Sequence, residues 1–487
     1  MRLAKGFGLV CFVGLWCAGS ALGVTRYVNA TNLTPGDPYM SWAAAATNIQ
    51  QAINACASGD QVLVAPGVYR VADTVSIPPS RTLTLRSTQS RGAVIDAQHF
   101  CTALDIQGTN SVVEGFTIRN GVTPDYGGGI ILSVASTVKD CLVTSNRAYG
   151  GAGIVLHKPG LVENCTIQSN LATLWAGGVL FYNDSSGTVN RCQILNNVAS
   201  NYGGGVAFQY HGTVSNSWIA DNRALLERGG GVHMELGGRL INSVVVSNRA
   251  HTEGGGIYAS YGYVAHCTVV SNVASDGGGV NLGLSDLWNT IVYFNTAATN
   301  PNVYAYSTVF SNNCATPHLG GRNFTNAPTF VNFAGRDFHL TPASSCVERG
   351  ATNPAVRIDY DGVTRPQIAT VAGAPEYDVG AFEFRLFWDA GYSDIGSGWR
   401  RLGWFGDYAS MGNGWIWHNK HGFWYPTPTS YEYDVWFYTQ DMGWLWTSRT
   451  KYPFLFRVSD GAWLWYNGAT NPRWFRNMTA GTWENRP

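Results

Sequence analysis

The sequence has little charge and no excess of either sign. Lys and Arg number 31 together, Asp and Glu also number 31, and charged residues make up only 13% of 487 residues. Nucleic-acid-binding proteins usually carry a basic patch or a basic excess, so we expect no nucleic-acid partner. Disordered chains combine high charge with few aromatic residues, whereas 45% of this chain is apolar and 13% is aromatic. We therefore expect a folded protein.

Long apolar runs are also scarce. The one extended run, residues 6–18, follows Arg2 and Lys5 and precedes the small residues of Ala21-Leu22-Gly23. This order is typical of a signal peptide, and the run is shorter than the ~20 residues of a membrane-spanning helix. We interpret residues 1–23 as a signal peptide, with a retained N-terminal anchor as the alternative. We therefore expect an exported protein without a transmembrane span.

Clustered cysteines and metal-binding motifs are missing. Cys11 and Cys17 lie within the predicted signal peptide, and the other eight cysteines are loosely spaced, unlike a disulfide scaffold. The histidines show no metal-ligand spacing, and the calcium-binding pattern G-G-x-G-x-D does not occur. We expect no metal and no cofactor.

Glycine is abundant, with 58 residues, and it marks an internal repeat. Each unit reads roughly G-G-G-[VI]-x-[LFM], a short turn, and V-x-N-C-x-[VI]-x-S-N-x-A. The seven units begin at Gly127, Gly151, Gly177, Gly203, Gly229, Gly254 and Gly277. A column of asparagines recurs at spacings of 23 to 27 residues: Asn146, Asn170, Asn197, Asn222, Asn248, Asn272 and Asn295.

Apolar residues alternate within each unit, as in Val206 and Phe208, which is the period of a β-strand. A second strand begins with a small residue, such as Cys141, Cys165 or Cys192, which we expect to form an interior column of unpaired thiols. Units of short strands close only by stacking on one another. We predict an all-β right-handed parallel β-helix in which the asparagines occupy a left-handed corner and bond to one another between coils. A leucine-rich repeat is excluded because L-x-x-L-x-L does not occur.

The repeat resembles the GGA[ILV] and FxxN repeats of polymorphic outer-membrane proteins and pectate-lyase-like β-helices in general. The segment 59–69 resembles the start of secreted bacterial β-helix proteins, and residues 359–366 with 378–383, D-Y-D-G-V-T-R-P and D-V-G-A-F-E, resemble the ending of the choice-of-anchor Q family. The resemblance covers residues 24–384 and implies an extracellular or bacterial cell-surface (outer-membrane) location. Ile49, Ala52, Ile53 and Cys56 share one helical face, so we expect a short helix that caps the N-terminal end of the stack.

Residues 385–487 form a second region, which holds 13 of the 18 tryptophans. Aromatic doublets separated by turn-forming residues predict a separate small domain of β-hairpins. Two interpretations stay open and are compatible with each other: the rings form the core of the domain, and some rings lie exposed and attach the protein to a glycan or envelope component. The resemblance to aromatic C-terminal modules of secreted bacterial proteins favours attachment or sorting, and there is a loose similarity to choline-binding repeats. The candidate binding residues are Trp415, Trp417, Trp444, Trp446, Trp463 and Trp465.

One column of the β-helix could form a binding stripe. It contains Tyr126, Trp175, Tyr202 and Arg228 as glycan-binding candidates and Glu253 and Asp276 as weak catalytic candidates, with Tyr149 in the second coil. An ordinary turn edge is the alternative interpretation. The N-x-D, D-D and G-H-G clusters of pectin hydrolases do not occur.

We therefore expect a structural or adhesive β-helix protein whose partner is a polysaccharide or a component of the cell envelope. A polysaccharide lyase or glycoside hydrolase on the same fold is the alternative, and the oligomeric state is left open.

Overall fold

A computed structural model describes residues 23–183, 185–341, 343–366, 376–384, 389, 392–411, 415–428, 434–470 and 472–486. Residues 1–22 of the predicted signal peptide lie outside this range. Among the described residues, no helix is long and apolar enough to cross a membrane. The described part of the chain contains a single helix, α1 (Ile49–Asn54), and its other regular elements are β-strands.

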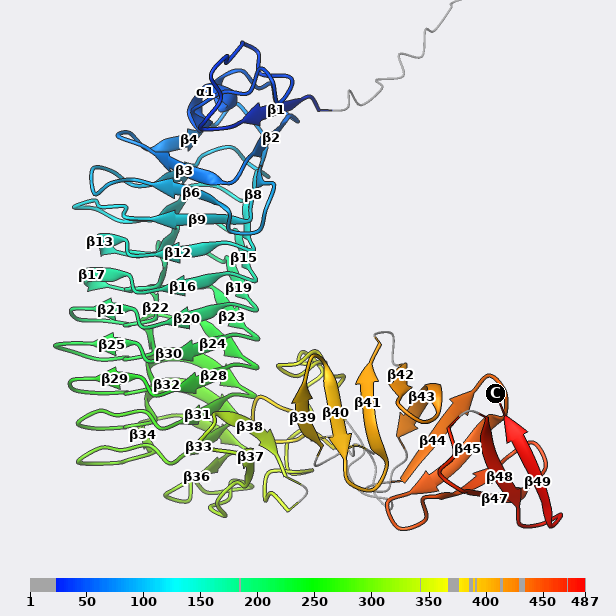
Figure 1. Cartoon of the computed structure of the whole chain (residues 1–487). Helices are drawn as coiled ribbons and strands as arrows, with labels where there is room; N and C mark the ends of the chain where they lie inside the picture. Colours follow the sequence, from blue (N-terminus) through cyan, green and yellow to red (C-terminus); the bar gives the residue numbers. More distant parts are fainter. Residues whose placement is uncertain are drawn as a thin grey trace, which may run out of the picture.

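Residues 25–315 form a parallel β-helix in which each strand pairs with the equivalent strand of the next coil (Figure 1). The first column contains β4 (Val75–Ile77), β7 (Leu104–Ile106), β10 (Ile130–Leu132), β14 (Ile154–Leu156), β18 (Val179–Phe181), β22 (Val206–Phe208), β26 (Val232–Met234), β30 (Ile257–Ala265), β32 (Val280–Trp288) and β34 (Val303–Ala305). The second column contains β1 (Thr25–Val28), β2 (Gln61–Val64), β5 (Thr84–Ser87), β8 (Val112–Glu114), β11 (Thr137–Lys139), β15 (Leu161–Glu163), β19 (Thr188–Asn190), β23 (Thr213–Ser215), β27 (Arg239–Ile241) and β35 (Val309–Ser311). Strands β30 and β32 are long enough to belong to both columns.

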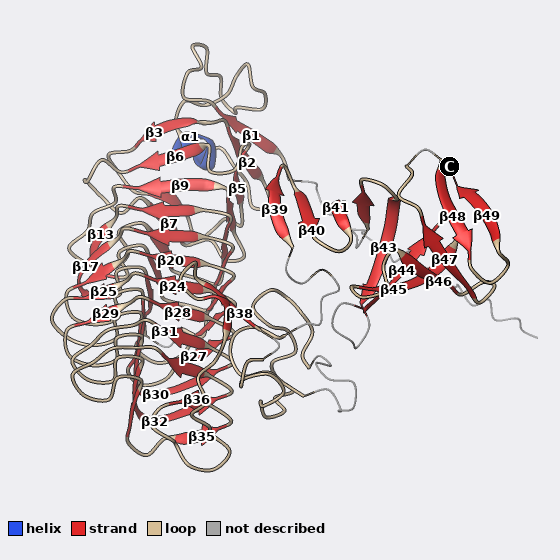
Figure 2. Cartoon of the chain, turned by 60° about the horizontal axis from the view of Figure 1, so that its bottom comes forward, coloured by secondary structure: helices blue, strands red, loops and turns tan. Residues whose placement is uncertain are grey.

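Two further columns complete the coils (Figure 2). The third contains β3 (Gly67–Arg70), β6 (Ala93–Asp96), β9 (Phe116–Arg119), β12 (Leu142–Thr144), β16 (Thr166–Gln168), β20 (Gln193–Leu195), β24 (Trp218–Ala220), β28 (Val244–Val246), β31 (Thr268–Val270), β33 (Ile291–Tyr293) and β36 (Cys314–Ala315). The short fourth column contains β13 (Arg147–Gly150), β17 (Leu171–Trp175), β21 (Val198–Ala199), β25 (Arg223–Ala224) and β29 (Arg249–Ala250). The predicted fold class is confirmed.

The asparagine column forms a continuous buried ladder. The Asn197 side chain accepts hydrogen bonds from the backbone N–H (3.1 Å) and Nδ2 (2.9 Å) of Asn170. Its own Nδ2 donates to Ile167 O (2.9 Å) and Asn222 Oδ1 (3.1 Å). The pattern repeats in neighbouring coils, so the predicted bonding between stacked asparagines is confirmed.

The left-handed corner lies one residue before the predicted position. The residues with positive φ are those that precede the ladder, such as Ser169 (φ 55°), Asn196 (φ 54°) and Asp221 (φ 59°). The ladder asparagines themselves are absent from this region of φ. Their role is therefore to satisfy buried backbone groups, while the preceding residue makes the bend.

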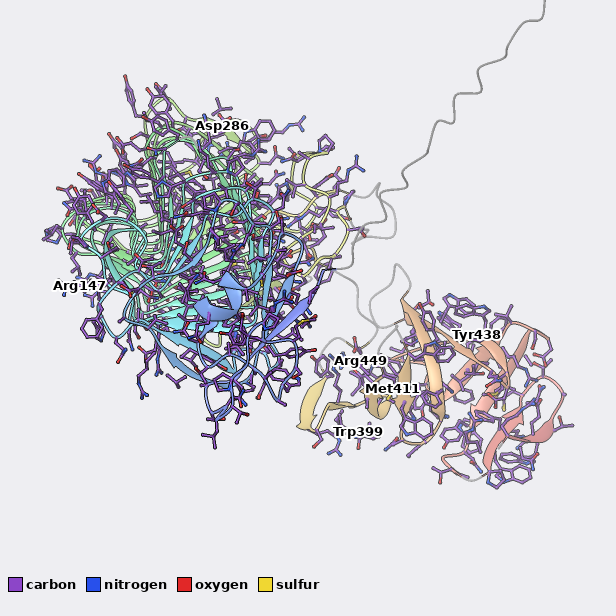
Figure 3. All side chains as sticks on the ribbon, turned by 90° about the horizontal axis from the view of Figure 1, so that it is seen from above. Arg147, Asp286, Trp399, Met411, Tyr438 and Arg449 are labelled. Carbon is purple, nitrogen blue, oxygen red and sulfur yellow. The ribbon has the colours of Figure 1, made fainter. Side chains whose placement is uncertain are left out.

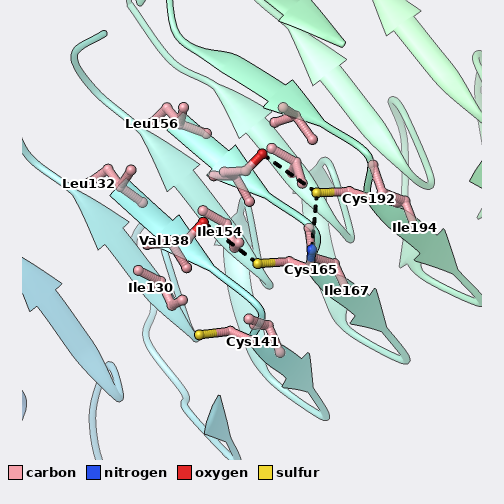
Figure 4. Close-up of a cluster of buried hydrophobic side chains, with 14 of the residues drawn as sticks. Ile130, Leu132, Val138, Cys141, Ile154, Leu156, Cys165, Ile167, Cys192 and Ile194 are labelled. Atoms are coloured by element: carbon pink, nitrogen blue, oxygen red, sulfur yellow. Dashed lines mark hydrogen bonds between the residues drawn. The ribbon is translucent and has the colours of Figure 1, made fainter. Parts of the chain in front are cut away.

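The cysteine column is interior, as predicted. Cys141, Cys165 and Cys192 are buried and unpaired, and their sulfur atoms lie in line among the apolar side chains of the strands (Figure 4). The backbone N–H of Cys165 donates to Cys192 Sγ at 3.4 Å. Burial raises the pKa of the Cys141 and Cys165 thiols well above the usual range.

The N-terminal end of the β-helix is covered by a short helix. At the N-terminal end, α1 begins after Asn48, whose side chain accepts from Gln50 N, and it buries Ile49, Ala52 and Ile53 as predicted. Beyond the last coil, β37 (Phe330–Asn332) and β38 (Asp337–Leu340) form a hairpin that packs outside the third column, where Phe338 stacks on Trp218 at 5.8 Å.

Residues 359–366 and 378–383, which resemble the ending of the choice-of-anchor Q family, pack against the outer face of the third column. Ala381 N donates to Thr268 Oγ1 (3.0 Å), and Gly380 N donates to Asn289 O (2.8 Å). Arg365 and Glu383 form a fully buried ion pair at 2.6 Å. This ion pair holds the ending in place.

The C-terminal region is a separate antiparallel sheet (Figure 1). Its strands are β39 (Ser393–Gly396), β40 (Trp399–Leu402), β41 (Gly406–Ser410), β42 (Ile416–His418), β43 (Gly422–Pro428), β44 (Asp434–Thr439), β45 (Gly443–Ser448), β46 (Phe454–Arg457), β47 (Ala462–Tyr466), β48 (Arg473–Asn477) and β49 (Thr482–Arg486). Each strand pairs with the next along the chain. Arg473 Nη1 also donates to His421 O (3.1 Å), so the sheet curls around one apolar core.

Replacing a ladder asparagine should destabilise the β-helix. Asn197→Ala removes four hydrogen bonds among buried groups, and we expect the free energy of unfolding to fall by about 2–4 kcal/mol. Chemical denaturation of the full-length protein measures this change. The control is Asn201→Ala, a half-buried asparagine outside the ladder; an equal effect of both variants would contradict a special role of the ladder.

The interior thiols should be unreactive in the folded protein. We expect Cys141, Cys165 and Cys192 to resist alkylation until the chain unfolds, because all three side chains are buried away from the reagent. The partly exposed Cys101 is an internal control. Mass spectrometry of the unreduced protein should find the three cysteines without disulfides, and a disulfide that involves any of them would overturn the interpretation.

His339, which lies in β38, should make the stability of the protein depend on pH. Burial opposes the charge of His339, but hydrogen bonds with Asp361 and Asp337 outweigh this effect and raise its pKa to about 9. Since the folded pKa lies above the ordinary value of 6.5, the stabilisation is complete below about pH 6.5 and is lost as the pH rises through about 9. The difference in Tm between wild type and His339→Gln should therefore be largest at about pH 6, below both pKa values, and should vanish at about pH 10, above both. The exposed His251→Gln variant is the control, and a difference that grows with pH would contradict this assignment.

Candidate functional site

The predicted stripe is a continuous backbone ladder on the outside of the β-helix. Its members pair or bond in the order Tyr126, Gly150, Trp175, Tyr202, Arg228, Glu253, Asp276 and Thr299. For example, Gly203 N donates to Arg228 O (3.2 Å) and Gly229 N donates to Glu253 O (2.9 Å). The stacking of coils thus brings the predicted candidates into one line.

The second coil departs from the predicted register. Gly150, and not Tyr149, occupies the stripe position, because it pairs with both Tyr126 and Trp175. Tyr149 lies one residue aside and contacts Tyr126 edge-on, at 5.5 Å between ring centroids. A side chain larger than that of glycine would not fit at position 150, since a Cβ there would lie 2.9 Å from the Tyr126 ring.

The aromatic half of the stripe packs against the outer face of the first strand column. Beneath it lie Val155, Leu180 and Ala207, which point outward from their strands and are nevertheless fully buried. Tyr126 and Trp175 are half-buried over this column. Trp175 meets Tyr202 at 4.6 Å with the rings tilted by 41°. These three rings therefore fill the space beside the sheet, and they do not lie flat and open to solvent.

The second half of the stripe changes in chemical character. The outward column continues through His233, Tyr258, Asn281 and Tyr304 in successive coils. Beside it, Arg228 donates to the Tyr258 hydroxyl (2.6 Å) and lies 3.7 Å from the Glu253 carboxylate. The stacking of successive coils thus brings these polar residues together, as it brings the apolar residues together in the first half.

A pocket of about 410 Å³ opens at this second half. Arg228, Glu253 and Tyr258 form one side, and Asn281, Tyr304 and Tyr306 lie in the following coils. The pocket size falls within the range of small-ligand sites. Asp276 does not line it, because its carboxylate accepts from Thr299 Oγ1 and Asn300 Nδ2, both at 2.7 Å.

His233 lies fully buried at the boundary between the two halves. Its ring stacks on Tyr258 (5.1 Å, 9°) and its Nε2 lies 2.8 Å from Glu235 Oε2. Burial lowers the pKa of His233, and the hydrogen bond to Glu235 opposes this effect. The neutral ring thereby supports the Tyr258 ring from below.

The candidate acids do not form a recognisable catalytic group. Glu253 pairs with Arg228, and Asp276 is occupied by the two neighbours named above. Within the described ranges, no group of three His, Cys, Asp or Glu side chains is placed to hold a metal ion. The arrangement provides hydrogen-bonding groups and rings, which are the elements of a binding site.

The C-terminal sheet carries a second aromatic surface. Alternation places Phe437, Leu445, Leu464 and Phe475 in the core, fully buried. The opposite face of strands β42–β49 is covered by rings, and Figure 3 shows the side chains projecting from this sheet around the labelled Tyr438. These outer aromatic residues, here called the aromatic face, are Trp415, Trp417, Phe423, Tyr425, Trp436, Tyr438, Trp444, Trp446, Phe454, Phe456, Trp463, Trp465, Trp474 and Trp483.

All six predicted tryptophans of this region lie on the aromatic face. Trp417 and Trp444 are each 40% exposed, and the other four are half-buried by neighbouring rings. The rings meet edge to face, as Trp446 and Trp463 do at 5.9 Å and 79°. Both interpretations thus hold in part, because Trp424, Phe437 and Phe475 belong to the core while the six predicted tryptophans lie on the outer face.

Sequence reasoning missed Tyr258, Asn281, Tyr304 and Tyr306. The first three stand between two inward-facing apolar residues of a strand, so their side chains point outward. Read down the coils, this middle position changes from Ile131, Val155 and Leu180 to His233, Tyr258 and Asn281. That change from apolar to polar is the signal that could have located the pocket.

Comparisons with known proteins concern the β-helix. A family model described as a right-handed β-helix region matches residues 152–332, which agrees with the predicted hand. Among solved structures, pectate lyase Pel9A is 16% identical, with 74% of this chain and 96% of that chain covered and a TM-score of 0.48. A rhamnogalacturonan lyase is 13% identical, with 70% and 99% covered and a TM-score of 0.39. No curated protein matches the chain.

Proposed function

We propose that the protein is exported and attached to a cell surface through the aromatic face, which binds a polysaccharide of the envelope. The β-helix then serves as a rigid structural or adhesive element. The observation that carries this proposal is the placement of aromatic rings on the solvent side of the C-terminal sheet while a complete apolar core lies on the other side.

An exposed aromatic surface of this extent needs a reason outside the fold. Large exposed apolar patches usually mark interaction sites. The hairpins already have a core of Leu, Phe and Tyr side chains, so the outer rings are in excess of what the sheet requires. Their mutual edge-to-face contacts contribute about 0.5–1.5 kcal/mol per pair, which fixes the ring orientations before a ligand arrives.

A polysaccharide suits this surface better than a nucleic acid. The electron-rich face of an aromatic ring attracts the C–H groups of a sugar ring, and Tyr425 and Tyr438 add hydroxyl groups to the surface. The full chain has no basic excess that would attract phosphates. Rings on successive strands also offer repeated contacts to a repeated ligand, which raises avidity.

The β-helix supports the role of a spacer. Ladders of backbone and asparagine hydrogen bonds link each coil to the next, and this gives a stack with little freedom to bend. An enzyme would need converging acid and base groups, whereas Glu253 and Asp276 are each held by neighbouring side chains.

The test is binding of the full-length mature protein to insoluble polysaccharides and to isolated envelope fractions. We expect the triple variant Trp417→Ala, Trp444→Ala and Trp483→Ala to weaken binding by at least about tenfold, or about 1.4 kcal/mol, without loss of folding. The matched control is Phe100→Ala with Tyr210→Ala, which removes exposed rings from the β-helix.

Unchanged binding by the triple variant would contradict attachment through the aromatic face. The same incubations are assayed for new reducing ends and unsaturated sugars. Product release would instead support the alternative, a polysaccharide lyase or glycoside hydrolase.

A further inference from the structure

We infer that the pocket beside Arg228, Glu253, Asn281 and Tyr304 binds a neutral oligosaccharide, as a second ligand site separate from the aromatic face. The pocket lies on the β-helix and shares no residue with the C-terminal sheet. It therefore does not depend on the attachment role proposed above.

Unsatisfied polar atoms gather around this pocket. Asn281 lines the pocket and is only 6% exposed, and its Nδ2 has no hydrogen-bond partner among the described residues. In the same part of the structure, Arg228 Nε and Thr252 Oγ1 are also buried without a hydrogen bond. A buried polar group without a partner costs about 1–3 kcal/mol, so folding alone does not explain them.

The amide of Asn281 can serve a ligand in either orientation. A half-turn about its last side-chain bond exchanges the donor and the acceptor, and no hydrogen bond of Nδ2 is lost in that turn. The amide can thus offer a donor or an acceptor to a hydroxyl group. This adaptability suits a ligand whose hydroxyls both donate and accept.

The rings around Asn281 indicate a sugar. Tyr258, Asn281 and Tyr304 occupy equivalent positions in three successive coils, which are stacked about 4.8 Å apart. The Arg228 guanidinium lies 4.6 Å from the centroid of the Tyr258 ring, and the His233 ring stacks on it at 5.1 Å, so Tyr258 is held in place and forms a wall. Tyr304 and Tyr306 are 42% and 70% exposed and are free to stack on a sugar ring. A chain of sugar units can extend along the β-helix axis, with rings and polar groups repeated in register.

The charges favour a neutral ligand. Among the residues that line the pocket, Arg228 is the single cation and Glu253 the single anion. The guanidinium is already compensated by Glu253 at 3.7 Å and Glu227 at 4.0 Å and by the Tyr258 hydroxyl. No positive charge is left over for a uronate, while the paired Arg and Glu can still bond to adjacent hydroxyls.

The experiment is isothermal titration calorimetry of the full-length mature protein with four hexasaccharides. Three are neutral β-1,4-linked chains of glucose, xylose or mannose, and the fourth is the acidic hexagalacturonate. We expect at least one neutral chain to bind, and Asn281→Ala and Tyr304→Ala each to weaken that binding at least about tenfold. Tyr210→Ala removes an equally exposed (42%) tyrosine outside the pocket and should leave binding unchanged.

The stability of Asn281→Ala distinguishes a binding residue from a structural one. Because the amide nitrogen has no partner, the midpoint of thermal unfolding should stay the same or rise while binding is lost. A lower midpoint would assign Asn281 to the fold and overturn its role in binding. Absence of binding by all three neutral chains, or tighter binding of hexagalacturonate, would overturn the site itself.

The two sites fail independently. The triple tryptophan variant of the aromatic face should keep its affinity for the soluble hexasaccharide while losing retention on polymers. Loss of hexasaccharide binding in that variant would contradict a separate site on the β-helix.

Discussion

Hydrogen bonding between successive coils is the interaction on which the rest of this structure depends. A single coil contains strands of only two to nine residues and has no partner for its backbone groups within itself. Pairing with the coils on either side satisfies those groups at the strands. At the corner after the third column the strands end, and the buried asparagine side chains take over by bonding to backbone groups and to one another.

This requirement for equivalent positions made most of the fold predictable from the sequence. The Asn column, the small interior residues and the alternation of Val206 and Phe208 must recur because each coil repeats the geometry of the last. The capping helix was predictable for a similar reason, since Ile49, Ala52 and Ile53 share one face. The left-handed residue was placed one position too late, because the sequence shows that an asparagine recurs and does not show which φ it adopts.

The site was less predictable because outward positions are not constrained by the interior. The sequence placed Arg228, Glu253 and Asp276 on one line, but it could not show that Asp276 turns to Thr299 and Asn300 while Glu253 faces the pocket. In the C-terminal sheet, the Trp-x-Trp pattern puts both rings on one face and leaves open which face meets solvent. The size of Trp favours burial, yet Leu445 and Leu464, which stand between the paired rings, are the residues that face the core.

The outward column of the β-helix shows how one architecture can be closed in one part and open in another. Where Val155, Leu180 and Ala207 face outward, the stripe supplies Tyr126, Trp175 and Tyr202, and apolar groups cover apolar groups. Where Tyr258 and Asn281 face outward, the stripe supplies Arg228 and Glu253. These two side chains offer less apolar surface and form an ion pair with each other beside the pocket. The backbone ladder is the same in both parts, so the pocket arises from side-chain exchange at fixed positions and not from a change of fold. A stacked fold of this kind can therefore acquire a binding site within two or three coils while the remaining coils keep the stability of the whole.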